Sequence, residues 1–68
     1  MYGDDVRDVQ FRLLALGYNE VGEVDGYFGP ETEVAVRNFQ AANGLTVDGV
    51  VGLVTWRKMF SGDAIPKP

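Results

Sequence analysis

The chain has 68 residues, enough for one domain and no more. Ten acidic and six basic side chains give a formal net charge of −4, which argues against a nucleic-acid binder and against docking on anionic lipid. Cysteine and histidine are absent, so disulfides, histidine-ligated zinc, thiol catalysis and serine–histidine catalysis are excluded. No apolar run approaches the roughly 20 residues of a membrane span, and residues 1–5 lack the features of a signal peptide.

The first predicted element is a helix that Asp4 or Asp5 is expected to cap. Apolar residues at helical spacing mark its buried face, namely Val6, Val9, Leu13 and Leu16. Gly17 is expected to end the helix by taking a left-handed conformation, and an irregular loop follows. Phe11 and Leu14 fall off the buried face, so they either lie exposed or pack under the C-terminal tail.

An eight-residue pattern, Asp-Gly-x-φ-Gly-x-x-Thr with φ apolar, occurs at 25–32 and again at 48–55. In each copy the aspartate carboxylate is expected to accept backbone N–H groups, while the glycine after it takes a positive φ angle. Neither copy carries the series of acidic residues that a calcium loop needs, so we interpret both as structural turns. The turn residues are Asp25, Gly26, Gly29, Thr32, Asp48, Gly49, Gly52 and Thr55.

The repeat extends upstream of the two turns. The sequence Val-Arg-x-Val-Gln at 6–10 recurs as Val-Arg-x-Phe-Gln at 36–40, and Gly-Tyr at 17–18 recurs as Gly-Leu at 44–45. The repeated unit therefore consists of a helix, a glycine stop, a loop, an Asp-Gly turn and the start of the next helix.

A second helix is predicted to begin at Pro30, because proline suits the first helical position, and Gly44 is expected to close it. Its buried face consists of Thr32, Ala35, Val36 and Phe39. A short third helix opens at Gly52, and its inward residues are Thr55, Trp56, Met59 and Phe60. These elements predict an all-α fold over residues 1–61, a compact three-helix bundle with two similar turn loops. Residues 62–68, which include two prolines, are predicted to form a linker or tail.

Three blocks of residues occur in the order that is typical of one known family. The first block contains Val6, Gln10, Leu13, Leu16, Gly17 and Tyr18. The second contains Asp25, Gly26, Phe28, Gly29, Pro30, Thr32, Ala35, Val36, Phe39 and Gln40. The third contains Gly44, Leu45, Asp48, Gly49, Gly52, Thr55 and Trp56. Over roughly residues 6–60 the chain thus resembles the helical peptidoglycan-binding domain, a small three-helix module of bacterial and phage cell-wall hydrolases.

The resemblance implies a non-catalytic module that anchors a covalently linked cell-wall hydrolase to murein (peptidoglycan) through its glycan or its stem peptide. It implies an extracellular or cell-wall location, in an exported bacterial protein or a phage lysin. We expect a monomer without a cofactor, a metal, a nucleic-acid partner or a membrane partner. A protein-docking or regulatory domain on the same fold is the alternative. A two-carboxylate glycosidase is disfavoured, because so small a bundle offers no deep cleft to raise the pKa of one carboxyl group.

Six residues are candidates for contact with peptidoglycan. Tyr18 and Tyr27 lie in predicted loops, where each ring offers a flat face and a hydroxyl, although a loop tyrosine serves as often as a lid on the core. Arg37 suits the carboxylates of a stem peptide, with an ion pair to Glu33 as the alternative. The remaining candidates form an amide-rich strip: Asn38, Gln40 and Asn43.

Three side chains have competing interpretations. Gln10 and Gln40 hold equivalent places in the repeat and either bind ligand or bond open backbone groups of the loops, which we favour for at least one of them. Trp56 would suit a sugar-stacking platform, but its spacing with Met59 and Phe60 favours the core.

Overall fold

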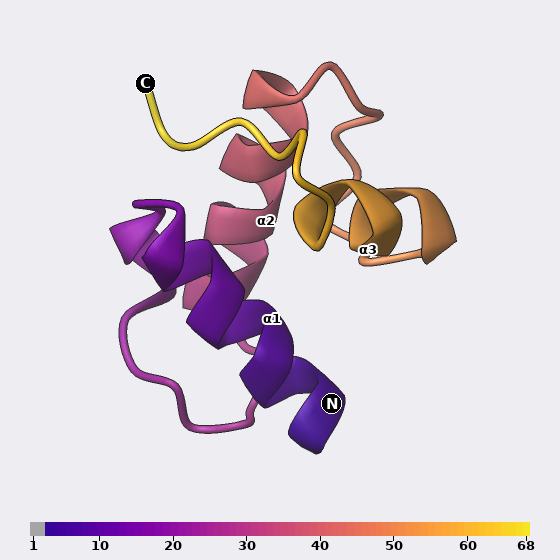
Figure 1. The fold of residues 1–68 in the computed structure, drawn as a ribbon. Helices are drawn as coiled ribbons and strands as arrows, with labels where there is room; N and C mark the ends of the chain where they lie inside the picture. Colours follow the sequence, from indigo (N-terminus) through magenta and orange to yellow (C-terminus); the bar gives the residue numbers. More distant parts are fainter. Residues whose placement is uncertain (1–2) are drawn as a thin grey trace.

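The computed structural model describes residues 3–68. Segment 1–5 lacks signal-peptide features in its sequence, and its first two residues lie outside the described range. Within that range the chain forms three α-helices, a short 3-10 helix and no strand, which confirms the predicted all-α fold (Figure 1). The elements are α1 (Asp4–Ala15), η1 (Asn19–Val21), α2 (Pro30–Ala42) and α3 (Leu53–Met59). None of these helices is long and apolar enough to span a membrane.

Helix α1 begins directly after Gly3 and carries Asp4 and Asp5 in its first turn. No side chain caps its N-terminus, so the expectation that one of these aspartates caps the helix is wrong. Within the first turn, their carboxylates interact favourably with the positive end of the helix dipole. Leu14 packs partly buried against the core, whereas Phe11 is 69% exposed.

Helices α1 and α2 end in the same way, as the repeat predicts. Gly17 and Gly44 follow the two helices with φ angles of 90° and 70°. After α1, the Tyr18 N–H donates to the Leu13 carbonyl five positions back at 2.8 Å, and the equivalent bond after α2 measures 2.9 Å. This pattern satisfies carbonyl groups that the end of a helix leaves open, and it turns the chain sharply.

Helix α3 buries only two of the four side chains that were predicted to face inward. Thr55 and Met59 are buried, but Trp56 is half-buried and Phe60 is 41% exposed. The Trp56 and Phe60 rings lie against each other, with centroids 4.4 Å apart. Residues four apart share one stripe of a helix. Thr55 and Met59 form the fully inward stripe of α3, whereas on the neighbouring stripe Trp56 packs only partly buried against the core and Phe60 lies exposed. The prediction that Phe60 faces inward is therefore wrong.

The hydrophobic core is formed by residues of α1, η1, α2 and the end of α3, together with Tyr18. Its buried members are Val9, Leu13, Tyr18, Val21, Ala35, Val36, Phe39 and Met59. The rings of Tyr18 and Phe39 meet edge to face with centroids 5.6 Å apart. The residue after Gly17 thus anchors the first loop to the face of α2.

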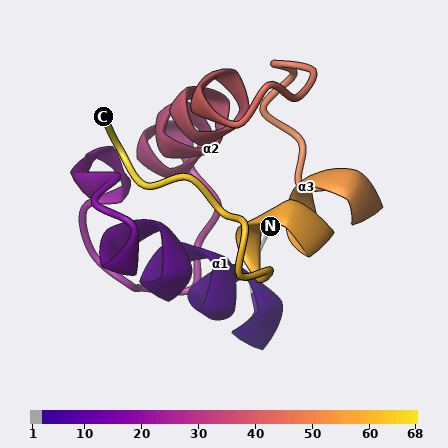
Figure 2. The same ribbon diagram turned by 45° about the horizontal axis from the view of Figure 1, so that its top comes forward.

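The segment 62–68, predicted to be a linker or tail, runs back from α3 across α2 toward η1 (Figure 1). Figure 2 shows it in yellow, passing between α2 and α1. Ala64 packs partly buried against the core, and the Lys67 N–H donates to the Leu16 carbonyl at 2.8 Å. This segment therefore lies against the helices rather than apart from them.

Candidate functional site

Each Asp-Gly loop folds around the side chain of one buried glutamine. In the first copy Gln10 is 1% exposed, and its amide oxygen accepts the Gly26 N–H at 2.9 Å. Its amide nitrogen lies 3.0 Å from each of three acceptors: the Asp25 carboxylate, the Tyr27 carbonyl and the Thr32 hydroxyl. The glutamine thus ties α1 to the turn and to the first turn of α2.

Gln40 repeats this arrangement in the second copy. It is fully buried, and its amide oxygen accepts the N–H groups of Asp48 and Gly49 at 3.1 and 3.0 Å. Its amide nitrogen donates to the Asp48 carboxylate, the Val50 carbonyl and the Thr55 hydroxyl at 2.9 to 3.1 Å. The structure therefore differs from the expectation that Gln40 contacts ligand, because the loop itself uses every polar atom of this side chain.

Asp25 and Asp48 lie exposed, and each carboxylate stabilises its own turn. The Asp25 carboxylate accepts the Tyr27 N–H and the Asp48 carboxylate accepts the Val50 N–H, both at 2.9 Å. These backbone N–H groups, followed by the glutamine amides, lower the pKa of Asp25 and of Asp48 below the ordinary value for aspartate. Among residues 3–68, no group of three or more acidic side chains is arranged to hold a metal ion.

An arginine lies over the glycine of each turn. A Cβ atom built on Gly26 would be 2.8 Å from the Arg7 Nε, and one on Gly49 would be 3.0 Å from the Arg37 Nε. Both glycines also have positive φ angles, 78° and 74°, so conformation and close approach favour glycine at both turns. Arg37 in addition forms the ion pair with Glu33 at 3.1 Å, with both side chains about half exposed. Gly29 and Gly52, the second glycines of the two copies, are the N-cap residues of α2 and α3.

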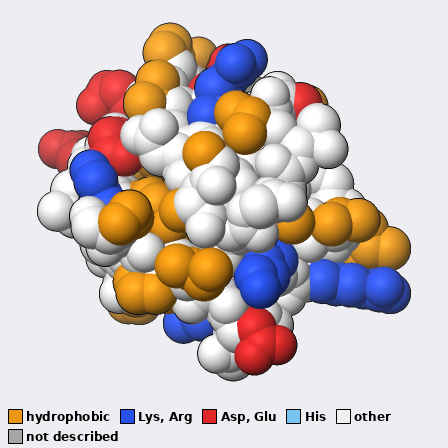
Figure 3. Space-filling view, turned by 90° about the horizontal axis from the view of Figure 1, so that it is seen from above, with side chains coloured by type: hydrophobic (Ala, Val, Ile, Leu, Met, Phe, Trp, Pro, Cys, Tyr) orange, Lys and Arg blue, Asp and Glu red, His pale blue; other side chains and the backbone are white. Residues whose placement is uncertain are grey.

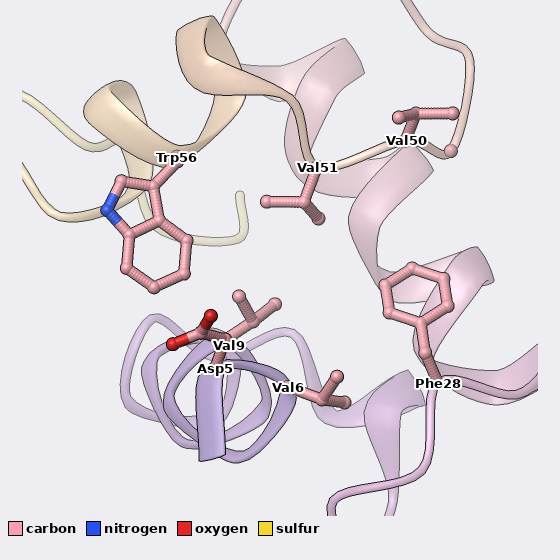
Figure 4. A pocket seen from close by; sticks show the side chains of 8 residues that line it. Asp5, Val6, Val9, Phe28, Val50, Val51 and Trp56 are labelled. Atoms are coloured by element: carbon pink, nitrogen blue, oxygen red, sulfur yellow. The ribbon is translucent and has the colours of Figure 1, made fainter. Parts of the chain in front are cut away.

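The two loops and helices α1 and α3 surround an apolar cavity of about 360 Å³ (Figure 4). Phe28 and Val51, the φ residues of the two copies, both line it. Figure 4 shows Trp56 across the cavity from Phe28, with Val51 between them and α1 below. The remaining lining residues are Asp5, Val6, Val9, Gly49 and Val50.

This cavity is a candidate site that the sequence did not predict. Trp56 packs partly buried against the core, as its spacing favoured, and it also lines the cavity. The sequence feature that points to the cavity is the apolar φ position of the repeat, because the φ residues of both copies, Phe28 and Val51, line it. Aromatic and aliphatic walls with a single carboxylate, that of Asp5, suit a ligand that has apolar faces and a few donors.

The structure does not bring the six predicted contact residues to one face. Tyr27 is 45% exposed and lines a smaller hollow, of about 240 Å³, that also involves Gly29 and Glu31. Tyr18 is 1% exposed and belongs to the core, so the expectation that it is a contact residue in a loop differs from what the structure shows. Only its hydroxyl reaches the edge of the core, where it donates to the Ile65 carbonyl at 2.8 Å.

Asn38 and Asn43 lie beside the C-terminal segment. The Asn38 amide donates to the Glu20 carboxylate at 2.7 Å, and the same carboxylate pairs with the Lys67 ammonium. The Asn43 side chain accepts the Ile65 N–H at 2.7 Å and donates to the Ile65 carbonyl at 3.2 Å. We call this set of residues the tail-binding surface: Leu16, Tyr18, Glu20, Asn38 and Asn43.

Within the tail-binding surface, hydrogen bonding lowers one pKa and burial raises another. Hydrogen bonds from Lys67 and then from Asn38 lower the pKa of Glu20, so its carboxylate stays ionised. Burial raises the pKa of the Tyr18 hydroxyl, which remains a hydrogen-bond donor.

Two known proteins align with most of this chain. The chain is 43% identical over 60 residues to the N-acetylmuramoyl-L-alanine amidase CwlM of Mycobacterium tuberculosis, an alignment that covers 88% of this chain and 14% of that protein. It is 43% identical over 61 residues to the zinc D-Ala-D-Ala carboxypeptidase of Streptomyces albus G, covering 85% of this chain and 23% of that protein. The chain thus spans less than a quarter of the length of these two relatives.

Solved structures show the same fold. The crystal structure of the SleB N-terminal domain matches with a TM-score of 0.81 and 45% identity, over 85% of this chain and 78% of that one. The Burkholderia AP3 phage endolysin matches with a TM-score of 0.82 and 38% identity, over 90% of this chain and 23% of that one. The model of one family, described as the putative peptidoglycan binding domain, matches residues 2–59. The chain belongs to the family of putative peptidoglycan-binding domains.

Proposed function

We propose that this chain is a non-catalytic module that binds peptidoglycan and holds a linked catalytic domain against the cell wall. Family membership supports the binding, and the relatives named as an amidase, a carboxypeptidase and an endolysin support the linkage, since each extends well beyond the matched region. The proposed place of action is outside the cell or at the cell wall. Weak affinity suffices there, because a linked partner and a repeating polymer multiply it.

The apolar cavity carries the proposal. Trp56 and Phe28 line it from two sides, and aromatic walls suit the apolar faces of sugar rings and the methyl groups of their acetyl and lactyl substituents. The Asp5 carboxylate at the same cavity would accept a hydroxyl or an amide N–H. We therefore place the glycan in this cavity, while contacts by Tyr27 and Arg37 stay predictions.

Composition supports a role without catalysis. The chain has no histidine and no cysteine, and its single serine, Ser61, lies next to the C-terminal segment. The aspartates of the two turns are bound to backbone N–H groups of their own loops. We expect the isolated chain to leave the turbidity of a cell-wall suspension unchanged, and clearing of that suspension would contradict this part of the proposal.

The test of binding is co-sedimentation of the full chain with insoluble peptidoglycan. Val50 lines the cavity with a side chain that is 61% exposed, and its loop bonds involve only its backbone. We expect Val50→Glu to reduce the pelleted fraction several-fold, because it places a charge at the apolar site. Val34→Glu is the matched control, since Val34 is 48% exposed on α2 and the charge change is identical.

The outcomes separate the proposal from its alternative. Pelleting of the wild type and of Val34→Glu, but not of Val50→Glu, supports peptidoglycan binding at the cavity. Equal pelleting of all three proteins leaves the module a peptidoglycan binder but removes the cavity as its site. Recovery of the wild type wholly in the supernatant contradicts the proposal and favours a protein-docking domain on this fold.

A further inference from the structure

The C-terminal segment is held mainly through its backbone. Asn43 pairs with both the N–H and the carbonyl of Ile65, and the Tyr18 hydroxyl donates to the same carbonyl. Two residues later, the Lys67 N–H donates to the Leu16 carbonyl. Ile65 is 46% exposed, so much of this residue stays outside the contact.

These bonds resemble the recognition of one extended strand by another. An amide side chain that accepts an N–H and donates to the carbonyl of the same residue reproduces the pair of bonds that a neighbouring strand would make. Such contacts give affinity for any extended peptide and leave specificity to side-chain sites. The tail-binding surface therefore offers the backbone contacts that a peptide-binding site needs.

Glu20 would supply the specificity for one kind of side chain. Its carboxylate accepts the Asn38 amide on one oxygen and the Lys67 ammonium on the other. The Glu20 side chain is 23% exposed, more enclosed than the 46% exposed lysine side chain, so the carboxylate is a fixed feature of the surface. A fixed carboxylate beside an extended backbone selects a residue with an amine on its side chain.

We propose that the tail-binding surface is a site for the peptidoglycan stem peptide, read as an extended backbone with a free side-chain amine, and that residues 65–67 of the chain itself compete for it. This inference rests on the proposed function. In the stem peptide, the amine belongs to the diamino acid. In the bound tail, the amine-bearing Lys67 follows Ile65, the residue held by Asn43, by two positions.

Competition by a tethered segment lowers the apparent affinity for a free peptide. The local concentration of a tethered segment is on the order of millimolar, and the apparent Kd rises by the inverse of the fraction of open sites. Weakening the tail is therefore expected to strengthen peptide binding, which is the opposite of what a tail with a purely structural role would do.

Two substitutions weaken the tail without touching the surface. Ile65→Pro removes the N–H that Asn43 accepts, and Lys67→Ala removes the ammonium that pairs with Glu20. Lys58→Ala, on α3, is the matched control for the loss of one lysine. Circular dichroism on each full-length variant first verifies that the helices are retained.

The experiment is a proton–nitrogen NMR titration with the N-terminally acetylated stem tripeptide, acetyl-L-Ala-γ-D-Glu-L-Lys, whose one free amine is the lysine Nε, and with its Nε-acetyl form. We expect the Ile65→Pro/Lys67→Ala variant to bind the free-amine peptide several-fold more tightly than the wild type and Lys58→Ala do. Shifts should centre on the backbone of Leu16 and on the Asn43 side-chain amide. Adding Glu20→Gln to the tail variant should abolish the preference for the free amine.

Equal affinities for the wild type and the tail variant, or shifts confined to the cavity, would overturn the inference. Co-sedimentation of the same proteins with insoluble peptidoglycan keeps the two proposals apart. If all proteins pellet but the tripeptide leaves the tail-binding surface unshifted, peptidoglycan binding stands and the stem-peptide site is wrong. If none pellets, the proposed function fails, and shifts at the tail-binding surface alone decide whether a peptide site exists.

Discussion

Gln10 and Gln40 are enclosed by the loops that follow their helices, and each bonds to a carboxylate, a carbonyl, a hydroxyl and at least one backbone N–H. A primary amide is the one neutral side chain that donates two protons and accepts at the same time. Within the part of the chain that the structure describes, every buried side-chain nitrogen and oxygen has a hydrogen-bond partner. The amides therefore specify the loop conformation as much as the Asp-Gly turns do.

The variant Gln40→Leu tests this role. The substitution keeps the approximate volume but leaves the N–H of Gly49 and the hydroxyl of Thr55 buried without their partner. Since each unsatisfied buried group costs about 1–3 kcal/mol, we expect the free energy of unfolding to fall by about 2–4 kcal/mol. Urea denaturation followed by circular dichroism measures it, with Thr46→Ala, an exposed site, as the control. An unchanged midpoint for Gln40→Leu would mean that the loop does not depend on the amide.

At the scale of elements, the two loops are copies in chemistry as well as in sequence. In each, a carboxylate holds the N–H two residues on, a glutamine holds the turn, and an arginine lies over the glycine. The copies differ in what precedes them, since only the first is reached through a 3-10 helix, η1. Their φ residues, Phe28 and Val51, meet at the cavity, so the duplication creates the candidate site.

The paired turns predict a loss of stability in acid. Because folding lowers the pKa of Asp25 and Asp48 below the unfolded value of about 3.9, their stabilisation is complete above that value and is lost as pH falls through the folded pKa values. We expect the thermal midpoint to drop as the pH is lowered below about 4, because these carboxylates then take up protons more readily in the unfolded chain than in the fold. In Asp25→Asn/Asp48→Asn, the carboxamide oxygen still accepts the N–H but does not titrate, so the drop should be smaller.

Asp63→Asn is the control for this pH series, because Asp63 lies exposed in the C-terminal segment. Glu20 adds to the same trend, since its pKa is also lowered in the fold. An identical pH dependence in the double asparagine variant and the wild type would show that the turn carboxylates do not account for the acid sensitivity.

At the scale of the whole molecule, charged and apolar side chains share a small surface. The domain measures 26 × 22 × 20 Å, and Figure 3 shows acidic, basic and apolar side chains interspersed on one face. The most exposed aliphatic side chains belong to Val50, Leu53 and Val54, at 61%, 64% and 69%. The last two lie on the outer side of α3, beyond the cavity.

We predict that the chain is a monomer, because its apolar groups are interrupted by charges and each molecule carries a net charge of −4. Sedimentation velocity between about 10 and about 500 μM should give one species near 7.5 kDa. The same measurement in about 0.5 M salt screens the repulsion between molecules and so tests the contribution of net charge. A mass that doubles with concentration would contradict the prediction and would point to the exposed face of α3.

Local chemistry in the sequence determined the elements. Helical spacing of apolar residues, the glycine stops and the Asp-Gly turns act between neighbours, so the sequence predicts the three helices and the two loops. The sequence left open whether Tyr18 covers the core and whether Gln40 bonds its own loop, and the tertiary structure decided both: Tyr18 is buried in the core and Gln40 is buried in its loop. It also decided how the φ residues converge on a cavity and how the tail returns to the helices. The contacts of Tyr18 with Ile65 and of Glu20 with Lys67 span 47 residues, and no local pattern encodes pairs so far apart.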